Sequence, residues 1–194
     1  MKEFWLCFLP LFVAVDAVGV LPLFIGLTEG IETTDRRRII LQSVATAGAV
    51  AVAFLAVGRI VLGFLGVTVA DFLIAGGVLL FALSLTDLLT AEKSRRRVNV
   101  ENLGAVPLGV PLIVGPAVLS TLFTLVVEYG ALTVILAILA NIAIAGTVFW
   151  FSGPINRLLG KAGSKTISKL AAFLLAAIAV TMVRRGLLML LTGG

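Results

Sequence analysis

The chain has 194 residues, of which 60% are hydrophobic and 13% are charged, and its mean hydropathy is +1.19. Soluble proteins carry about 25% charged residues, so this composition excludes a soluble protein and predicts an integral membrane protein. The sequence has no histidine, and Cys7 is its one cysteine. A disulfide within one chain, a His/Cys metal site and a catalytic triad that uses histidine are therefore excluded.

Charged residues divide the chain into apolar segments of membrane-spanning length. A spanning helix needs roughly 20 mostly apolar residues to cross a hydrocarbon core of about 30 Å. In chain order the candidate segments are 4–28, 39–57, 72–89, 103–127, 129–155 and 167–190. The first is a helix rather than a signal peptide, because it continues for twelve uncharged residues beyond Asp16 without a small-x-small cleavage site. We expect an all-α, multi-pass protein of the cytoplasmic (inner) membrane with six transmembrane helices.

Basic residues cluster in three of the predicted connections. These residues are Arg36, Arg37 and Arg38, then Lys93, Arg95, Arg96 and Arg97, then Arg157, Lys161 and Lys165. Lys and Arg in short connections favour the cytoplasmic side, so both termini are predicted on the non-cytoplasmic side. Because the membrane accounts for the positive charge, membrane lipid is an expected partner and nucleic acid is not.

The two halves of the sequence resemble each other. An L-G-x-x-G pattern at 62–66 recurs at 159–163, and VDAVGVLPLF at 15–24 aligns with VGPAVLSTLF at 114–123. We therefore predict two three-helix repeats, 1–97 and 98–194, which together form one membrane domain. An odd number of crossings inserts the second repeat upside down, and inverted repeats are the usual construction of secondary transporters.

Helix breakers occur at matching places in the first and fourth segments. Asp16 lies at the centre of the first segment, followed by Gly19 and Pro22, and we expect the helix to kink or break just after Asp16. The fourth segment contains PLGVPLIVGPAVLS, 107–120, which has too many prolines and glycines for a continuous helix. Broken helices at corresponding places indicate a transporter binding site. The candidate binding residues are Asp16, Gly19, Pro22, Pro111, Gly115, Pro116, Ser120, Thr121 and Asn141.

Several polar positions have a structural alternative that the sequence leaves open. Asp16 is either a binding residue or a cap of the broken helix. Ser120 and Thr121 either contact substrate or donate hydrogen bonds to the backbone of their own helix. Asn141 either forms a hydrogen bond between helices or faces a cavity. Gly76 and Gly77 are expected to be close-packing sites. Asp71 and Asp87 are expected at the interfacial ends of their helix, although Asp87 lies about one turn inside and facing the core is its alternative. Arg184 and Arg185 are expected to extend toward the outer interface.

These motifs resemble the MarC family, which is also described as small neutral amino acid transporters with six helices. The family's first helix carries D-P-x-G-N-x-P, and this chain reads D-A-V-G-V-L-P, which keeps Asp16, Gly19 and Pro22 but has Ala17 and Val20 instead of proline and asparagine. Other similar stretches are IAGGVLLF at 74–81, the fourth-segment motif at 107–120, and AAIAVTMVRRG at 176–186.

The resemblance implies uptake or export of glycine, alanine, serine or threonine, driven by a proton or Na⁺ gradient and without another cofactor. Backbone amides at helix starts near 19–22 and 115–117 would bind the substrate's carboxylate. Asp16 would bind its ammonium group or the coupling ion. The alternative functions are a channel and a membrane scaffold. The sequence leaves open whether the protein forms a homo-oligomer. An intramembrane aspartyl protease, and with it an enzyme, is not expected, because the G-x-G-D pattern of those proteases is absent.

Overall fold

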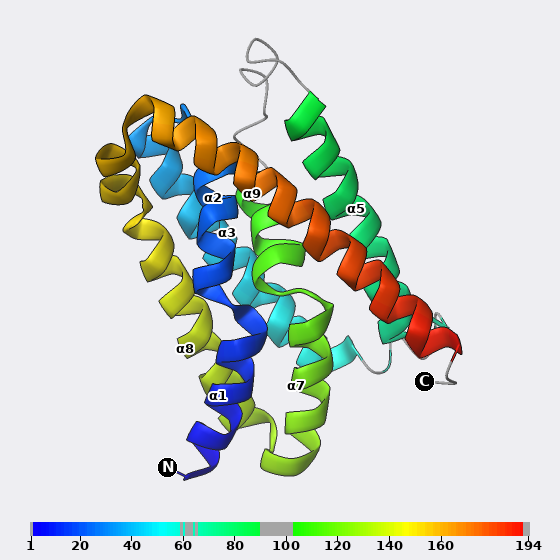
Figure 1. The fold of residues 1–194 in the computed structure, drawn as a ribbon. Coiled ribbons are helices and arrows are strands. Elements are labelled where there is room, and N and C mark those ends of the chain that lie inside the picture. Colours follow the sequence, from blue (N-terminus) through cyan, green and yellow to red (C-terminus); the bar gives the residue numbers. More distant parts are fainter. Residues whose placement is uncertain (1, 59, 61–63, 65, 90–102, 192–194) are drawn as a thin grey trace.

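The computed structural model describes residues 2–58, 60, 64, 66–89 and 103–191, and every regular element in these ranges is helical (Figure 1). The first half of the chain forms α1 (Lys2–Val15), α2 (Ala17–Leu27), α3 (Thr33–Ala53), η1 (Phe54–Gly58) and α5 (Val69–Leu89). The second half forms η3 (Gly104–Ile113), α7 (Pro116–Tyr129), α8 (Ala131–Trp150) and α9 (Ser152–Leu191). The predicted all-α class is confirmed for these residues. The predicted repeat boundary at 97 and the basic cluster at 93–97 lie outside them.

Each predicted apolar segment contains a helix. In the described part of the chain, four helical stretches are long and apolar enough to cross a membrane: Lys2–Leu27, Thr33–Gly58, Ala131–Pro154 and Ala172–Leu191. The pair formed by η3 and α7, which is bent by 55°, makes a fifth if the two helices belong to one span. The third predicted segment corresponds to α5, whose described apolar part is Leu73–Ala82. The chain is thus a membrane protein with several spans, while the six-span topology stays a prediction.

The last helix begins earlier than the sequence suggested. We expected a connection between 155 and 167, but α9 is helical over 40 residues, which is about 60 Å along its axis. Its one proline, Pro154, lies in the first turn, where proline is tolerated. Charged residues lower the hydropathy of a segment without preventing helix formation, so only Ala172–Leu191 is a candidate span.

The first and last helices have their outer ends, the start of α1 and the end of α9, at the same end of the helix bundle. In Figure 1, α1 starts and α9 ends at the lower end, whereas the α2–α3 connection and the α8–α9 junction lie at the upper end. At that upper end the Arg37 guanidinium carbon lies 4.8 Å from the centroid of the Trp150 ring. Trp5 and Trp150, both largely exposed, thus mark opposite ends of the bundle, as aromatic residues do at the two membrane interfaces.

Small residues allow the helices to approach closely. A Cβ on Gly146 of α8 would lie 2.7 Å from Val44 Cγ2 of α3, and a Cβ on Gly77 of α5 would lie 2.7 Å from the Ala179 carbonyl oxygen of α9. Helices in lipid associate through close packing rather than through a hydrophobic driving force. Gly77 is therefore a packing site, and the long contact of α5 with α9 forms one side of the site described next.

Candidate functional site

A single residue, Asp16, separates α1 from α2. Its φ of 44° and ψ of 53° lie in the left-handed region, which is uncommon for residues other than glycine but more accessible to Asp and Asn. Asp16 N donates to the Phe12 oxygen at 3.1 Å and Val20 N donates to the Asp16 oxygen at 3.0 Å, so backbone bonding continues on both sides. The interruption therefore lies at Asp16 itself, and α2 runs on through Pro22.

Gly19 fixes the orientation of the Asp16 carboxylate. Its amide donates to Asp16 Oδ1 at 3.1 Å, which makes Asp16 the N-cap of α2. A Cβ on Gly19 would collide with Oδ2 of the same carboxylate and lie 2.7 Å from its Cγ. Glycine at position 19 is thus what allows the carboxylate to cap the helix.

The second interruption lies between η3 and α7. Val106 and Val110 within η3 have extended backbones, with φ of −133° and −136°. Each precedes a proline, whose ring disfavours the helical conformation of the residue before it. Gly115, with ψ of 179°, then ends the irregular stretch, and Pro116 starts α7 at the position where a missing amide proton costs nothing. The sequence pattern at 107–120 therefore breaks this segment, which bends by 55°.

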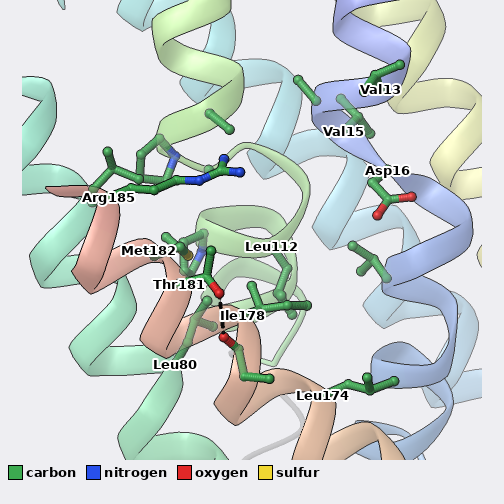
Figure 2. Close-up of a pocket in the computed structure, with 18 residues that line it drawn as sticks. Val13, Val15, Asp16, Leu80, Leu112, Leu174, Ile178, Thr181, Met182 and Arg185 are labelled. Atoms are coloured by element: carbon green, nitrogen blue, oxygen red, sulfur yellow. Dashed lines mark hydrogen bonds between the residues drawn. The ribbon is translucent and has the colours of Figure 1, made fainter. Parts of the chain in front are cut away.

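The two interruptions meet at one cavity of about 560 Å³ (Figure 2). Its walls come from the end of α1 with Asp16, from the η3–α7 break, and from the facing sides of α5 and α9. Binding sites for small molecules typically measure about 300 to 1,000 Å³. The cavity therefore has room for a small solute together with water.

Three polar side chains line this cavity among the described residues: Asp16, Thr181 and Arg185. The Asp16 carboxylate points into it from the α1 side, and the Arg185 side chain extends into it from α9 on the opposite side (Figure 2). Thr181 Oγ1 donates to the Ala177 oxygen at 3.0 Å, which leaves its oxygen free to accept a hydrogen bond. Otherwise the walls are apolar side chains and backbone, so one acidic and one basic group dominate the electrostatics.

The similarity to known proteins covers almost the whole chain. The model of the MarC family, described as integral membrane proteins, matches residues 1–191. The chain belongs to the MarC family. A UPF0056 membrane protein of Archaeoglobus fulgidus is 32% identical over 96% of this chain and 93% of its own length. The UPF0056 inner membrane protein YhgN of Escherichia coli is 29% identical over 94% and 95%. No solved structure matches this one.

One of the two departures from the MarC motif changes the cavity wall. Val20 occupies the position of the motif's asparagine and lines the cavity, whereas Ala17, at the position of the motif's proline, is not among the lining residues. Where the MarC motif carries an amide, this chain presents an apolar side chain. The wall next to Asp16 therefore offers fewer hydrogen-bonding groups than the motif would.

The structure brings four of the predicted MarC site residues together. Asp16, Pro111, Gly115 and Pro116 all line the cavity, while Gly19 and Pro22 lie in α2 and are not among the lining residues. Of these two, Gly19 holds the Asp16 carboxylate through its amide.

The other three predicted site residues are not among the lining residues. The hydroxyl groups of Ser120 and Thr121 donate to the Ala117 oxygen at 3.0 and 2.8 Å. Asn141 Nδ2 donates to the Phe8 oxygen at 3.2 Å and to the Ala137 oxygen at 2.9 Å. Asn141 therefore connects α8 to α1, which is one of the two alternatives that the sequence left open.

Two of the remaining charged positions occupy different environments. Asp71 lies in the first turn of α5, where its Oδ2 accepts from Thr68 N and Thr68 Oγ1 at 2.7 Å, so it marks a helix end as expected. The side chain of Asp87 lies outside the described part of the structure. Arg185 lines the cavity, although we expected it at the outer interface. A feature of the sequence could have indicated this position of Arg185. Ala177, Thr181 and Arg185 follow one another at intervals of four residues and therefore share one helix face.

Proposed function

We propose that this MarC protein is a secondary transporter that moves a small neutral amino acid across the cytoplasmic membrane by alternating access. The observation that carries this proposal is that both helix interruptions line one cavity, and that Asp16, which forms the first of them, is among the lining residues. Transporters with discontinuous helices bind substrate where the interrupted segments meet, because irregular backbone at membrane depth must line a cavity or be covered by protein.

The chemistry of the cavity suits an amino acid. The Asp16 carboxylate accepts hydrogen bonds from the substrate's ammonium group. At the start of α7 the first intrahelical bond runs from Leu119 N to the Gly115 oxygen, so the preceding Ala117 amide has no acceptor within its helix. This amide and the helix dipole attract a carboxylate. The apolar walls suit a side chain as small as that of glycine or alanine.

The helix contacts support an inverted repeat. In this arrangement α1–α2, α3 and α5 of the first half correspond to η3–α7, α8 and α9 of the second half. The contact between α1 and α8 then matches the contact between η3 and α3. The contact between α2 and α9 matches the contact between α7 and α5. Two halves with matching contacts would rock against each other around the shared cavity. In this proposal the repeats are 1–97 and 98–194, and the end that carries Arg36, Arg37 and Arg38 is cytoplasmic.

Asp16 is also the proposed site of coupling to the ion gradient. It is the acidic side chain that lines the cavity among the described residues, and a carboxylate can take up either a proton or Na⁺. No further cofactor and no enzymatic activity are proposed.

Flux into proteoliposomes tests the proposal. Purified protein is reconstituted, and uptake of radiolabelled glycine and L-alanine is followed with an imposed pH gradient, an imposed Na⁺ gradient, or neither. A transporter accumulates substrate above the external concentration under one of the gradients, and Asp16→Asn abolishes this accumulation. Equilibration without accumulation under either gradient would indicate a channel. Absence of flux above that of empty liposomes would contradict transport and favour a scaffold.

A further inference from the structure

We propose that Arg185 binds the carboxylate of the substrate, so that the cavity selects zwitterions by engaging two opposite charges at once. This inference rests on the proposed transport function, because it assigns the second charged group of the same cavity. Asp16 binds the ammonium group from the α1 side, and Arg185 binds the carboxylate from α9.

The position of Arg185 is unusual for an arginine in an apolar helix. It lies within the candidate span Ala172–Leu191 and lines the cavity. A charged side chain within a span costs about 2.5 to 3.5 kcal/mol on insertion scales, and such residues generally face a water-filled cavity or a partner. Arg184, about 100° further round the helix, is not among the lining residues. The helix thus directs one of two adjacent arginines into the cavity.

The contacts of the two charged groups leave both available to a ligand. Asp16 accepts one hydrogen bond, from the Gly19 amide, and neither Asp16 nor Arg185 makes an ion pair within the described ranges. The cavity lies between them (Figure 2). A molecule that carries an ammonium group and a carboxylate compensates both charges, whereas a plain amine or a plain carboxylic acid leaves one of them without a partner.

The start of α7 is close to the same turn of α9. A Cβ on Gly76 of α5 would lie 3.2 Å from Met182 Cε and 3.8 Å from Pro116 Cγ, so α7 and α9 both contact α5 at this level. Ala117 at the start of α7 and Arg185 line the same cavity, so in this proposal the Ala117 amide assists Arg185 in binding the carboxylate. Arginine suits this role because its planar guanidinium matches the two carboxylate oxygens.

Competition with analogues tests the assignment. Uptake of radiolabelled glycine is inhibited with L-alanine, with L-alaninamide, which lacks the carboxylate, and with propionate, which lacks the ammonium group. We expect the wild type to prefer L-alanine over both analogues by roughly 10- to 100-fold, the range of a lost charge-assisted contact. Arg185→Gln weakens L-alanine binding by at least tenfold and abolishes the preference over L-alaninamide. The matched control, Arg184→Gln, stays within twofold of the wild type.

The outcomes separate this inference from the proposed function. If the wild type carries no neutral amino acid, the transport proposal fails. If the wild type transports and Arg185→Gln keeps the preference for L-alanine over L-alaninamide, only the role of Arg185 is wrong. Size-exclusion profiles of the variants show whether a loss of uptake reflects misfolding.

Cysteine labelling gives a second test, which does not depend on measuring transport by the Arg185→Gln variant. In a Cys7→Ala background, Arg185→Cys is treated with an anionic methanethiosulfonate reagent in detergent, with and without L-alanine. We expect labelling at least threefold faster than that of a control cysteine on α9 outside the cavity, and no protection by L-alanine beyond that expected from its weakened binding to this variant. Val180→Cys is the control, because Val180 is exposed on α9 but is not a lining residue, so lipid or detergent covers it. Absence of labelling at position 185, or labelling no faster than at position 180, would overturn the assignment.

Discussion

The Gly19 amide donates a hydrogen bond to Asp16 Oδ1 at 3.1 Å, and a Cβ on Gly19 would collide with the same carboxylate. This pair explains how an acidic side chain in the middle of an apolar span is held at a helix start. It also shows that position 19 controls the direction of the carboxylate without lining the cavity.

Gly19→Ala should therefore impair function more than stability. The new methyl group displaces the Asp16 carboxylate, and we expect uptake of L-alanine to fall at least tenfold. Gly48→Ala in α3 is the matched control, because its Cβ would meet Leu139 Cδ2 at an ordinary 3.5 Å. Initial rates in proteoliposomes measure the effect, and equal rates for the two variants would contradict this role of Gly19.

Asp16→Asn should separate the charge of Asp16 from its capping role. Asparagine caps helices as well as aspartate does and also accepts left-handed backbone, so we expect a thermal midpoint close to that of the wild type. Asp16→Ala removes the cap as well and should cost about 0.5 to 2 kcal/mol. Both variants should lose gradient-driven uptake. Accumulation by Asp16→Asn at the wild-type level would show that the negative charge is not used.

The adjacent glycines of α5 should respond differently to alanine. At Gly77 a Cβ would lie 2.7 Å from the Ala179 oxygen, which is backbone and cannot yield, whereas at Gly76 the nearest atom is the flexible end of Met182 at 3.2 Å. We expect Gly77→Ala to lower stability by about 1 to 3 kcal/mol and Gly76→Ala to cost clearly less. Thermal unfolding in detergent measures the difference. Equal midpoints would contradict the close contact of α5 with α9.

Asn141 should matter for stability but not for selectivity. Its amide joins α8 to α1 at Phe8, and interhelical hydrogen bonds in membranes contribute about 0.6 kcal/mol on average and up to about 1.7. Asn141→Leu should lower the unfolding midpoint modestly and leave the inhibition constants of L-alanine and L-alaninamide unchanged. A changed ratio of these constants would instead place Asn141 in the binding site.

The orientation of the chain can be checked with two single-cysteine variants in a Cys7→Ala background. Glu3 lies at the start of α1 and Glu32 between α2 and α3, at opposite ends of the bundle, and both are exposed. We expect an impermeant maleimide to label Glu3→Cys in intact cells and to label Glu32→Cys only after permeabilisation. The reverse pattern would place the termini in the cytoplasm.

The interruptions of the first and fourth segments were predictable because their causes are local. Proline restricts the residue before it, so Val106 and Val110 are extended, and aspartate tolerates the left-handed backbone that separates α1 from α2. These effects depend on neighbours in the sequence and do not require a partner helix. The same local reasoning selected Asp16, Pro111, Gly115 and Pro116, which line the cavity.

The remaining features depend on packing, which the sequence alone does not determine. Arg185 faces the cavity because of how α9 lies against α5, so hydropathy alone suggested the interface. Ser120 and Thr121 bond to the Ala117 carbonyl, an option open to any hydroxyl in a helix. The early start of α9 was missed because hydropathy marks contact with lipid and not helicity.

The one-residue interruption at Asp16 has a mechanical consequence. Hydrogen bonds continue immediately before and after it, from Asp16 N to Phe12 and from Val20 N to Asp16, so two dihedral angles of one residue set the direction of α2 relative to α1. The side chain of that same residue faces the cavity. If Asp16 is the coupling site proposed above, a cation that draws the carboxylate away from the Gly19 amide would change the backbone between α1 and α2 directly, without a relay through neighbouring side chains.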